Sequence, residues 1–358
     1  MAPANARVDH EVAARVGDTP VMHVALVIID GVRPREIFAG GDPERSPEAL
    51  SAEALTPHLH ALMRRGVALG RPRVGARFAA SGPNFVSLPG YTELLAGHPS
   101  SCQSNDCDER PTSTLLDAFA GDDGAPAALG VLSSWSPIGR IVAGAPKGTL
   151  VSTGRHGARG FEALPALTPL GKILEQGDEA APSPGWGDYR PDEHTIVLAE
   201  ALLAEARPRF VFVSLGDTDE RAHAGDYQGY LAALGRADAF VGAVDRRFEA
   251  WRGAGEPSLV VVATDHGRAA NFTDHGGAYP ESADAWLIAA GSGLPAVGDV
   301  SLGEPAHLCD VPHAIATLAH VRWASEPGAR DLTRDVARAR ERSGLEDSDA
   351  LAVLAQAR

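Results

Sequence analysis

The fold is decided by one stretch, residues 259–277, which reads LVVVATDHGRAANFTDHGG. Its apolar, largely β-branched start, Leu259 to Val262, predicts a buried parallel strand. Asp265 and His266 follow, at the carboxyl end of the strand, where open α/β sheets hold their ligands. A second imidazole, His275, lies in a glycine-rich loop. A divalent metal would suit this carboxylate and imidazole pair, but a cap residue beside a surface His fits a lone pair equally well, so other stretches must decide.

The composition limits the fold classes and binding partners that are possible for this chain. A chain of 358 residues with 44% hydrophobic content can bury a large core, either as one α/β domain or as one domain with an inserted cap. The formal net charge of −15 and the absence of a dense Lys/Arg run argue against binding to a nucleic acid duplex. Any anionic substrate must therefore be held by positive charge gathered locally.

The N-terminal extension, residues 1–20, lacks an apolar run long enough for a signal peptide, and no later run reaches membrane-spanning length. We therefore expect a soluble, cytoplasmic protein without membrane contact, unless a leader has been removed. The three cysteines are too few for a disulfide framework and fit a reducing compartment. Cys102 and Cys107 could pair or bind metal, but without a second cysteine pair we interpret them as ordinary residues.

Two further strands end as the first one does. Residues 21–29, VMHVALVII, lead into Asp30 and Gly31, which alone could be an ordinary turn. Residues 208–217, PRFVFVSLGD, lead into Asp219 and His223, whose spacing of four places both side chains on one helical face, where they can share a metal. Asp217 is a rival ligand at this strand end.

Residues 81–97, SGPNFVSLPGYTELLAG, contain a sharp Pro-Gly entry into a short helix. Ser87 precedes that helix, where the backbone N–H groups would favour a serine alkoxide and an incoming anion. A simple N-cap role fits Ser87 as well. In the polar loop 101–114, Asn105 is a candidate donor to a substrate oxygen, or else a turn residue.

Strands that alternate with helices predict an α/β fold with a doubly wound, mostly parallel sheet and helices on both faces. The helix over 227–251 has a buried apolar face, the stretch 285–291 is a further strand, and the tail from Arg330 is a surface helix. We expect a catalytic core formed by residues 21–135 and 196–358. The Gly- and Pro-rich segment 136–195 is predicted to be a small irregular cap or a set of long loops.

Three strands thus deliver carboxylates to one edge of the sheet, and two of the same stretches also deliver His. These residues divide into two ligand sets, one formed by Asp219, His223 and His275, the other by Asp30, Asp265, His266 and the hydroxyl of Ser87. Mixed carboxylate and imidazole ligands favour two divalent ions, Zn²⁺ first and Mn²⁺ as the alternative.

At this point the chain resembles the alkaline phosphatase superfamily, with the motifs in the same order. The matching stretches are IIDGVRP (28–34), TPHLHALMRRGV (56–67), SLPGYTELLAG (87–97), DTDERAH (217–223), TDHG (264–267) with His275, and CDVPHAIATL (309–318). The resemblance implies an alkaline phosphatase-like fold and a two-metal hydrolase of small phosphate esters, monoesters or diesters, with Ser87 as the nucleophile that becomes phosphoserine. It also places Asn105 like a phosphate-contacting Asn of the nucleotide pyrophosphatase/phosphodiesterase branch.

Other branches remain open at this stage. Sulfatases of the superfamily carry x-Pro-Ser-Arg after the modified residue, whereas Leu88 and Pro89 lead here into Gly90 and Tyr91. The short gap from His266 to His275 is similar to phosphopentomutase and phosphoglycerate mutase, so a phosphomutase is the main alternative, although Arg268 replaces the usual Asn. A phosphonate hydrolase-like activity and a metal-binding pseudoenzyme also remain, and the oligomeric state is left open.

Overall fold

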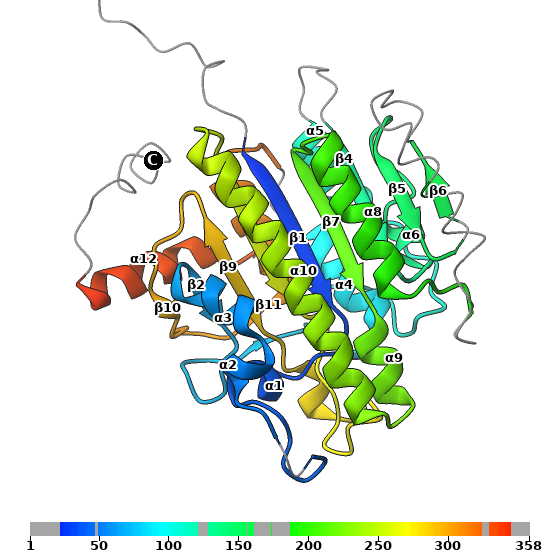
Figure 1. The fold of residues 1–358 in the computed structure, drawn as a ribbon, viewed down its shortest axis with the longest axis vertical. Helices are drawn as coiled ribbons and strands as arrows, with labels where there is room; N and C mark the ends of the chain where they lie inside the picture. Colours follow the sequence, from blue (N-terminus) through cyan, green and yellow to red (C-terminus); the bar gives the residue numbers. More distant parts are fainter. Residues whose placement is uncertain are drawn as a thin grey trace, which may run out of the picture.

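A sheet of nine strands runs through the centre of the computed structural model, as far as its described residues show (Figure 1). The described residues are 22–46, 49–120, 128–155, 157–160, 173, 187–323 and 329–344. The predicted N-terminal extension lies outside them. No helix in these parts of the chain combines the length and the apolar character needed to cross a bilayer.

The centre of the sheet is strand β1 (His23–Ile29), which lies between β7 (Phe210–Leu215) and β8 (Ser258–Ala263) and parallel to both. Their sequences HVALVII, FVFVSL and SLVVVA are almost continuously apolar, as expected for strands covered on both faces. Because all three run in one direction, the residues that follow them emerge at one edge of the sheet.

The order across the sheet is β10-β2-β9-β8-β1-β7-β4-β5-β6. Most neighbours are parallel, as predicted, but β9 (Leu287–Gly291) and β6 (Gly157–Arg159) run against the other strands. A separate pair, β3 with β11, lies outside the main sheet. The remaining strands are β2 (Val67–Leu69), β3 (Phe78–Ala79), β4 (Leu129–Ser133), β5 (Leu150–Thr153), β10 (Gly298–Asp299) and β11 (Ala306–His307).

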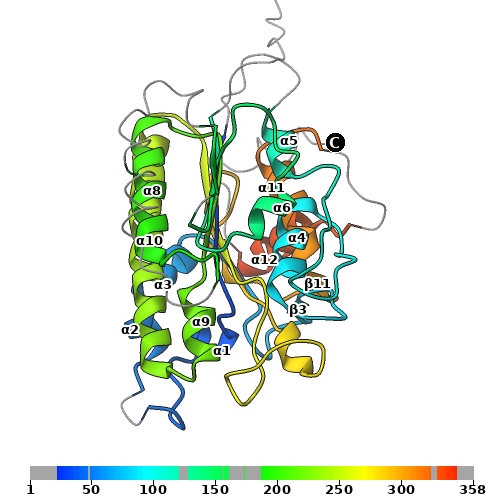
Figure 2. The same ribbon diagram turned by 90° about the vertical axis from the view of Figure 1, so that its right-hand side faces the viewer.

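Helices cover both faces of the sheet, which confirms the doubly wound prediction (Figure 2). One face carries α1 (Pro34–Phe38), α2 (Ala52–Leu55), α3 (Pro57–Arg64), α8 (Asp192–Glu205), α9 (Asp217–His223) and α10 (Tyr227–Gly253). The other carries α4 (Ser87–Ala96), α5 (Leu115–Ala120), α6 (Ile138–Ile141), α11 (Val311–Leu318) and α12 (Leu332–Ser343). Two 3₁₀ turns, η3 (Pro280–Ala283) and η4 (Leu308–Asp310), connect elements after β8 and β11.

The core consists of two layers, one on each face of the sheet. Alternate residues of β1 belong to different layers: Leu26 belongs to the apolar cluster that includes residues of α4 and α11, whereas Val27 belongs to the cluster that includes residues of α8 and α10. The predicted apolar face of α10 is buried throughout, at Tyr230, Leu234, Ala237, Val241, Val244, Phe248 and Trp251. The two apolar layers therefore hold the sheet in place, and the sheet positions the residues at its carboxyl edge.

The segment 136–195 contributes to the sheet where the structure describes it. β5 pairs in parallel with β4, and β6 then pairs with β5. Residues 161–172 and 174–186 lie outside the described residues. The division into a core and a cap therefore stays a prediction.

Candidate active site

Four of the predicted ligands and the predicted nucleophile meet at the carboxyl edge of β1, β7 and β8. Asp30 follows β1, Asp219 lies in the first turn of α9, and Asp265 and His266 follow β8. Ser87 is the first residue of α4, on the opposite face of the sheet, and all five side chains are buried. The structure thus brings together residues that are far apart in the sequence.

Helix α4 begins earlier than the Pro-Gly pair suggests. Val86 is its N-cap, so Ser87 is not the cap that the simpler interpretation made it. Pro89 is tolerated inside the first turn because the N–H that it lacks has no partner within the helix there. The Ser87 hydroxyl therefore lies at the positive end of the helix dipole.

His266 is oriented by its own backbone. Its Nδ1 lies 2.8 Å from the carbonyl oxygen of Gly267, which places the ring proton on Nδ1 and leaves the Nε2 lone pair available. Nε2 lies 3.3 Å from the Ser87 hydroxyl oxygen. Burial lowers the pKa of His266 to about 4, so its ring is neutral at pH 7.

Two carboxylates face the same nitrogen. Asp30 Oδ1 and Asp265 Oδ2 each lie 3.4 Å from His266 Nε2, and neither buried oxygen accepts a hydrogen bond from any described residue. Their second oxygens are occupied, since Asp30 accepts from the Tyr91 hydroxyl at 2.8 Å and Asp265 accepts from the Gly31 N–H at 3.1 Å. Burial raises the pKa of Asp265 to about 7 and that of Asp30 well above its ordinary value.

This arrangement fits a cation. Unpartnered, buried carboxylate oxygens around an imidazole lone pair are unfavourable alone, and a divalent ion would satisfy all of them. Ligands about 2.0–2.1 Å from a tetrahedral Zn²⁺ lie about 3.3–3.4 Å from one another. The separations of His266 Nε2 from Ser87, Asp30 and Asp265 have this length.

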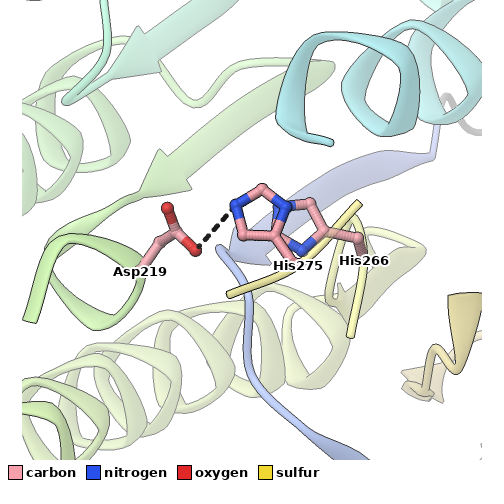
Figure 3. Close-up of side chains that lie close together, drawn as sticks. All are labelled: Asp219, His266 and His275. Atoms are coloured by element: carbon pink, nitrogen blue, oxygen red, sulfur yellow. Dashed lines mark ion pairs between the residues drawn. The ribbon is translucent and has the colours of Figure 1, made fainter. Parts of the chain in front are cut away.

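A second group of possible ligands adjoins the first (Figure 3). His223 Nε2 lies 3.1 Å from Asp219 Oδ2 and 3.0 Å from His275 Nε2. His275 Nε2 lies 3.8 Å from Asp219 Oδ1, the contact dashed in Figure 3, and its Nδ1 faces the Phe85 carbonyl at 3.0 Å. Both His275 and Asp219 therefore present ligand atoms toward one point.

The two groups share a member that the sequence assigned to only one of them. Ligand atoms of Asp219, His266 and His275 lie within 4.8 Å of one another, and so do those of Asp30, Asp265 and His266. The rings of His266 and His275 stack with centroids 4.0 Å apart. The two candidate metal positions are therefore adjacent.

Arg268 is a neighbour of the site that the sequence analysis noted only as a replacement for Asn. Its guanidinium forms an ion pair with Asp219 and also donates to the carbonyls of Phe272 at 2.6 Å and Thr273 at 2.9 Å. Burial raises the pKa of Asp219, but Arg268 and the imidazoles of His275 and His223 outweigh it and bring that pKa well below its ordinary value. Asp219 is therefore charged before any metal binds.

A cavity of about 110 Å³ opens beside these groups. It is lined by Asp30, Ser87, Asn105, Trp135, Tyr189, Gly216, Asp219, Glu220 and His223. The Asn105 side-chain oxygen accepts the Leu88 N–H at 2.9 Å, which leaves its amide N–H groups for another acceptor. Burial and the charge of Asp219 raise the pKa of Glu220 to about 7.

The rival ligand Asp217 is directed elsewhere. Its carboxylate accepts from the Tyr189 hydroxyl at 2.7 Å and forms an ion pair with Arg236 at 3.0 Å. Tyr91 and Glu220 are neighbours of the site that sequence reasoning missed. Tyr91 could have been found from its position four residues after Ser87, on the same helical face.

The expectation that Cys102 and Cys107 are unpaired is wrong, because they form a disulfide with Cα atoms 5.7 Å apart. A polar loop with no second cysteine pair gave no sign that the chain turns back on itself there. Asn105 lies inside this small ring, and Arg140 donates to the carbonyls of Asn105 and Cys107 at 3.1 and 2.9 Å. The disulfide and Arg140 therefore hold Asn105 in place.

No family model and no curated protein sequence matches this chain. A protein of the alkaline phosphatase superfamily from Vibrio parahaemolyticus is similar over 88% of this chain and 70% of its own, with 13% identity and a TM-score of 0.56. Murine ectonucleotide pyrophosphatase/phosphodiesterase 5, solved with AMP, is similar over 88% and 99%, with 11% identity and a TM-score of 0.53. A mutant TAB5 alkaline phosphatase with bound Mg is similar over 85% and 99%, with 13% identity and a TM-score of 0.51.

These similar structures show that the chain has the doubly wound α/β fold of the alkaline phosphatase superfamily, as the sequence motifs predicted. Within that fold, this chain carries two adjacent groups of possible metal ligands. The identity of the metal and the roles of Ser87 and Asn105 stay predictions.

Proposed function

We propose that the protein is a metal-dependent hydrolase of phosphate esters that acts through a phosphoserine at Ser87. One observation carries the proposal: Ser87 opens a helix with its hydroxyl oxygen 3.3 Å from His266 Nε2, beside two buried carboxylate oxygens that no described residue satisfies. A serine placed among such ligands is activated as a nucleophile rather than used as a cap.

Two ligand sets would hold the ions. Asp30, Asp265, His266 and Ser87 form one set, and Asp219, His223 and His275 form the other. Two bound divalent ions, Zn²⁺ by preference and Mn²⁺ as the alternative, would supply Lewis acidity, which lowers the pKa of the attacking hydroxyl and stabilises the departing oxygen.

The residues of the chain perform the remaining tasks. Ser87 forms a bond to phosphorus while the ester P–O bond breaks and the alcohol leaves. Water then cleaves the phosphoserine and restores the hydroxyl. Asn105, whose oxygen is engaged by Leu88, directs its amide N–H groups to an oxygen of the phosphoryl group. The positive charge of the two bound ions would allow a chain with net charge −15 to bind an anionic substrate.

The test is Ser87→Ala, assayed with phosphate monoesters, diesters, phosphonates and sulfate esters. We expect at least about a 10³-fold loss of turnover, as for other lost nucleophiles, with metal content retained. Ser343→Ala, at the exposed end of α12, is the matched control and should keep full activity. Full activity of Ser87→Ala would refute the covalent step.

The same panel separates the alternatives. A phosphomutase would isomerise sugar phosphates without net phosphate release, and a metal-binding pseudoenzyme would bind zinc yet turn over none of the esters. We expect the substrate to be a small phosphate ester and the protein to act without a membrane or nucleic acid partner. The expectation of a cytoplasmic location rested partly on free thiols, and the Cys102–Cys107 disulfide removes that support.

A further inference from the structure

A second cavity, of about 460 Å³, is lined by an unusual number of cationic side chains. Six arginines and two carboxylates contribute to its wall, in a chain whose net charge is −15. The arginines are Arg33, Arg35, Arg71, Arg73, Arg77 and Arg268, and the acids are Glu281 and Asp284. We name this the arginine cavity.

The arginine cavity lies at the same edge of the sheet as the candidate active site. Its lining follows β1 at residues 33–35, β2 at residues 70–77 and β8 at residues 281–285. Figures 1 and 2 place α1, which begins in this lining, at the lower end of the molecule beside the ends of these strands. In the sheet order the cavity lies on the β2 side of β1, whereas Trp135 and Gly216 of the first cavity follow β4 and β7 on the other side.

Some of its guanidinium groups are already neutralised. Arg33 is buried against Glu36 and Asp42, and Arg268 is fully buried against Asp219. These two shape the wall rather than offer charge to a ligand.

The other guanidinium groups reach solvent. Arg71 and Arg77 have side chains that are 28% and 46% exposed, and each is paired with an acid, Asp299 at 2.7 Å and Asp284 at 2.6 Å. Arg35 is 44% exposed, and its acid partner Asp42 lies farther away, at 3.6 Å. Arg73 is exposed and has no hydrogen bond or ion pair with any described residue. Charge that is available to an anion therefore comes from Arg73, which has no acid partner, and from Arg35, whose acid partner is the most distant.

The loop that carries Arg73 is fixed in place. Gly70 and Gly75 both have positive φ, and a Cβ atom on either would lie 2.1 Å from the Ala285 oxygen or 2.5 Å from the Leu302 nitrogen. Between them Arg73 itself has a φ of 67°, a left-handed conformation that is costly for a residue with a side chain. Strain of this kind is concentrated at binding sites, where the surrounding structure maintains it.

We propose that the arginine cavity binds a small anion that carries two or more phosphate groups. Arginine offers paired N–H donors that match phosphate oxygens, and Arg35 and Arg73 around one cavity can each engage a phosphate group. The cavity has the volume of a small-molecule site. The site is separate from the Ser87 chemistry and does not depend on the proposed function.

The test uses tripolyphosphate as the probe and isothermal titration calorimetry as the measurement. Binding is compared between the wild type, Arg35→Ala/Arg73→Ala and Arg64→Ala, an exposed arginine of α3 outside the cavity. We expect the double variant to bind at least about tenfold more weakly, equivalent to about 1.4 kcal/mol, and Arg64→Ala to bind as the wild type does. Added salt should weaken wild-type binding, because the contacts are partly exposed ion pairs.

Two further arms separate this site from the candidate active site. Binding should persist after chelation of metal and in Ser87→Ala, which cannot turn the probe over by the proposed route. Arg73→Lys should give an intermediate affinity, because it keeps the charge but loses the paired donors. Equal affinity of the double variant and the wild type, or binding that disappears with the metal, would overturn the proposal.

Discussion

Three oxygen atoms lie within 3.4 Å of His266 Nε2, which carries no proton: it can accept a hydrogen bond from the Ser87 hydroxyl, but it cannot donate one to either carboxylate. The proton that could have served them lies on Nδ1, where the Gly267 carbonyl accepts it. A cation is therefore the group that resolves the local charge. This conclusion depends on which ring nitrogen of His266 carries the proton as much as on the types of side chain that surround it.

Metal binding should depend on pH because of the carboxyls in this group. Burial raises the pKa of Asp265 to about 7, so that carboxyl is largely protonated in metal-free protein near pH 6, and burial also raises the pKa of Asp30 well above its ordinary value. Zinc needs the charged carboxylates, so binding releases protons and the affinity falls as the pH drops from about 8 to 5. The hydrogen bond to Asp219 raises the pKa of His223. Protonation of this imidazole therefore also weakens zinc binding as the pH falls.

Calorimetry in two buffers of different ionisation enthalpy measures the released protons directly. His266 adds no proton over this range, because burial lowers its pKa to about 4. A zinc affinity that is constant from pH 5 to 8, with no proton release, would contradict the raised pKa values.

For individual residues, the sequence was sufficient to predict those site positions that follow from the direction of the strands. Asp30, Asp265 and His266 end parallel strands, so their meeting needs only the sheet. Tyr91 and Arg268 could not be assigned in the same way, because their partners Asp30 and Asp219 are reached through side-chain packing across the sheet edge.

At the scale of elements, helix α4 approaches the end of β8 very closely. A Cβ atom on Gly90 would lie 2.3 Å from the backbone oxygen of Asp265. Gly90→Ala should therefore push α4 away and cost about 1–3 kcal/mol of stability, with a loss of activity because Ser87 moves with the helix. Urea denaturation and ester turnover measure both effects.

Gly235→Ala is the matched control, since Gly235 lies within α10 and no described atom lies within 4 Å of its Cβ position. There the substitution should stabilise the protein by about 0.5–1 kcal/mol. Equal effects at positions 90 and 235 would show that the close approach is unimportant.

The Cys102–Cys107 disulfide should determine how firmly Asn105 is held in position. Reduction of the Cys102–Cys107 disulfide, or Cys102→Ser, frees the ring that holds Asn105 and should lower turnover, by less than the roughly 10²-fold expected for Asn105→Ala. In Asn105→Ala, reduction should have no further effect, and Cys309→Ser should behave as the wild type. A full additional loss in Asn105→Ala would show that the disulfide acts on something else.

Strand and helix positions were predictable where the pattern was long, as over β1, β7 and α10. The direction of β9 was not, because AWLIAAG reads the same for a parallel and an antiparallel strand. The start of α4 was also missed, because a Pro-Gly pair is typical of a turn, whereas here Pro89 and Gly90 both lie within the helix.

At the scale of the whole molecule, the possible ligands come from β1, α4, α9 and the segment after β8. A bound ion would therefore connect distant parts of the chain and stabilise the folded state by about 2.7 kcal/mol at a hundredfold excess over Kd. We expect chelation to lower the Tm and zinc to restore it. In Asp265→Asn the Tm should no longer respond to zinc, whereas Asp108→Asn, an exposed acid, should respond as the wild type does.

The sheet order has a consequence for how the protein is made. Among the strands that the structure describes, β1 is synthesised first, yet its two neighbours, β7 and β8, come much later in the chain. Until they emerge, an apolar strand with two unpaired edges remains in the nascent chain, which is the form most prone to aggregate. β8 also delivers Asp265 and His266, so the protein can acquire its metal only after most of the chain has left the ribosome.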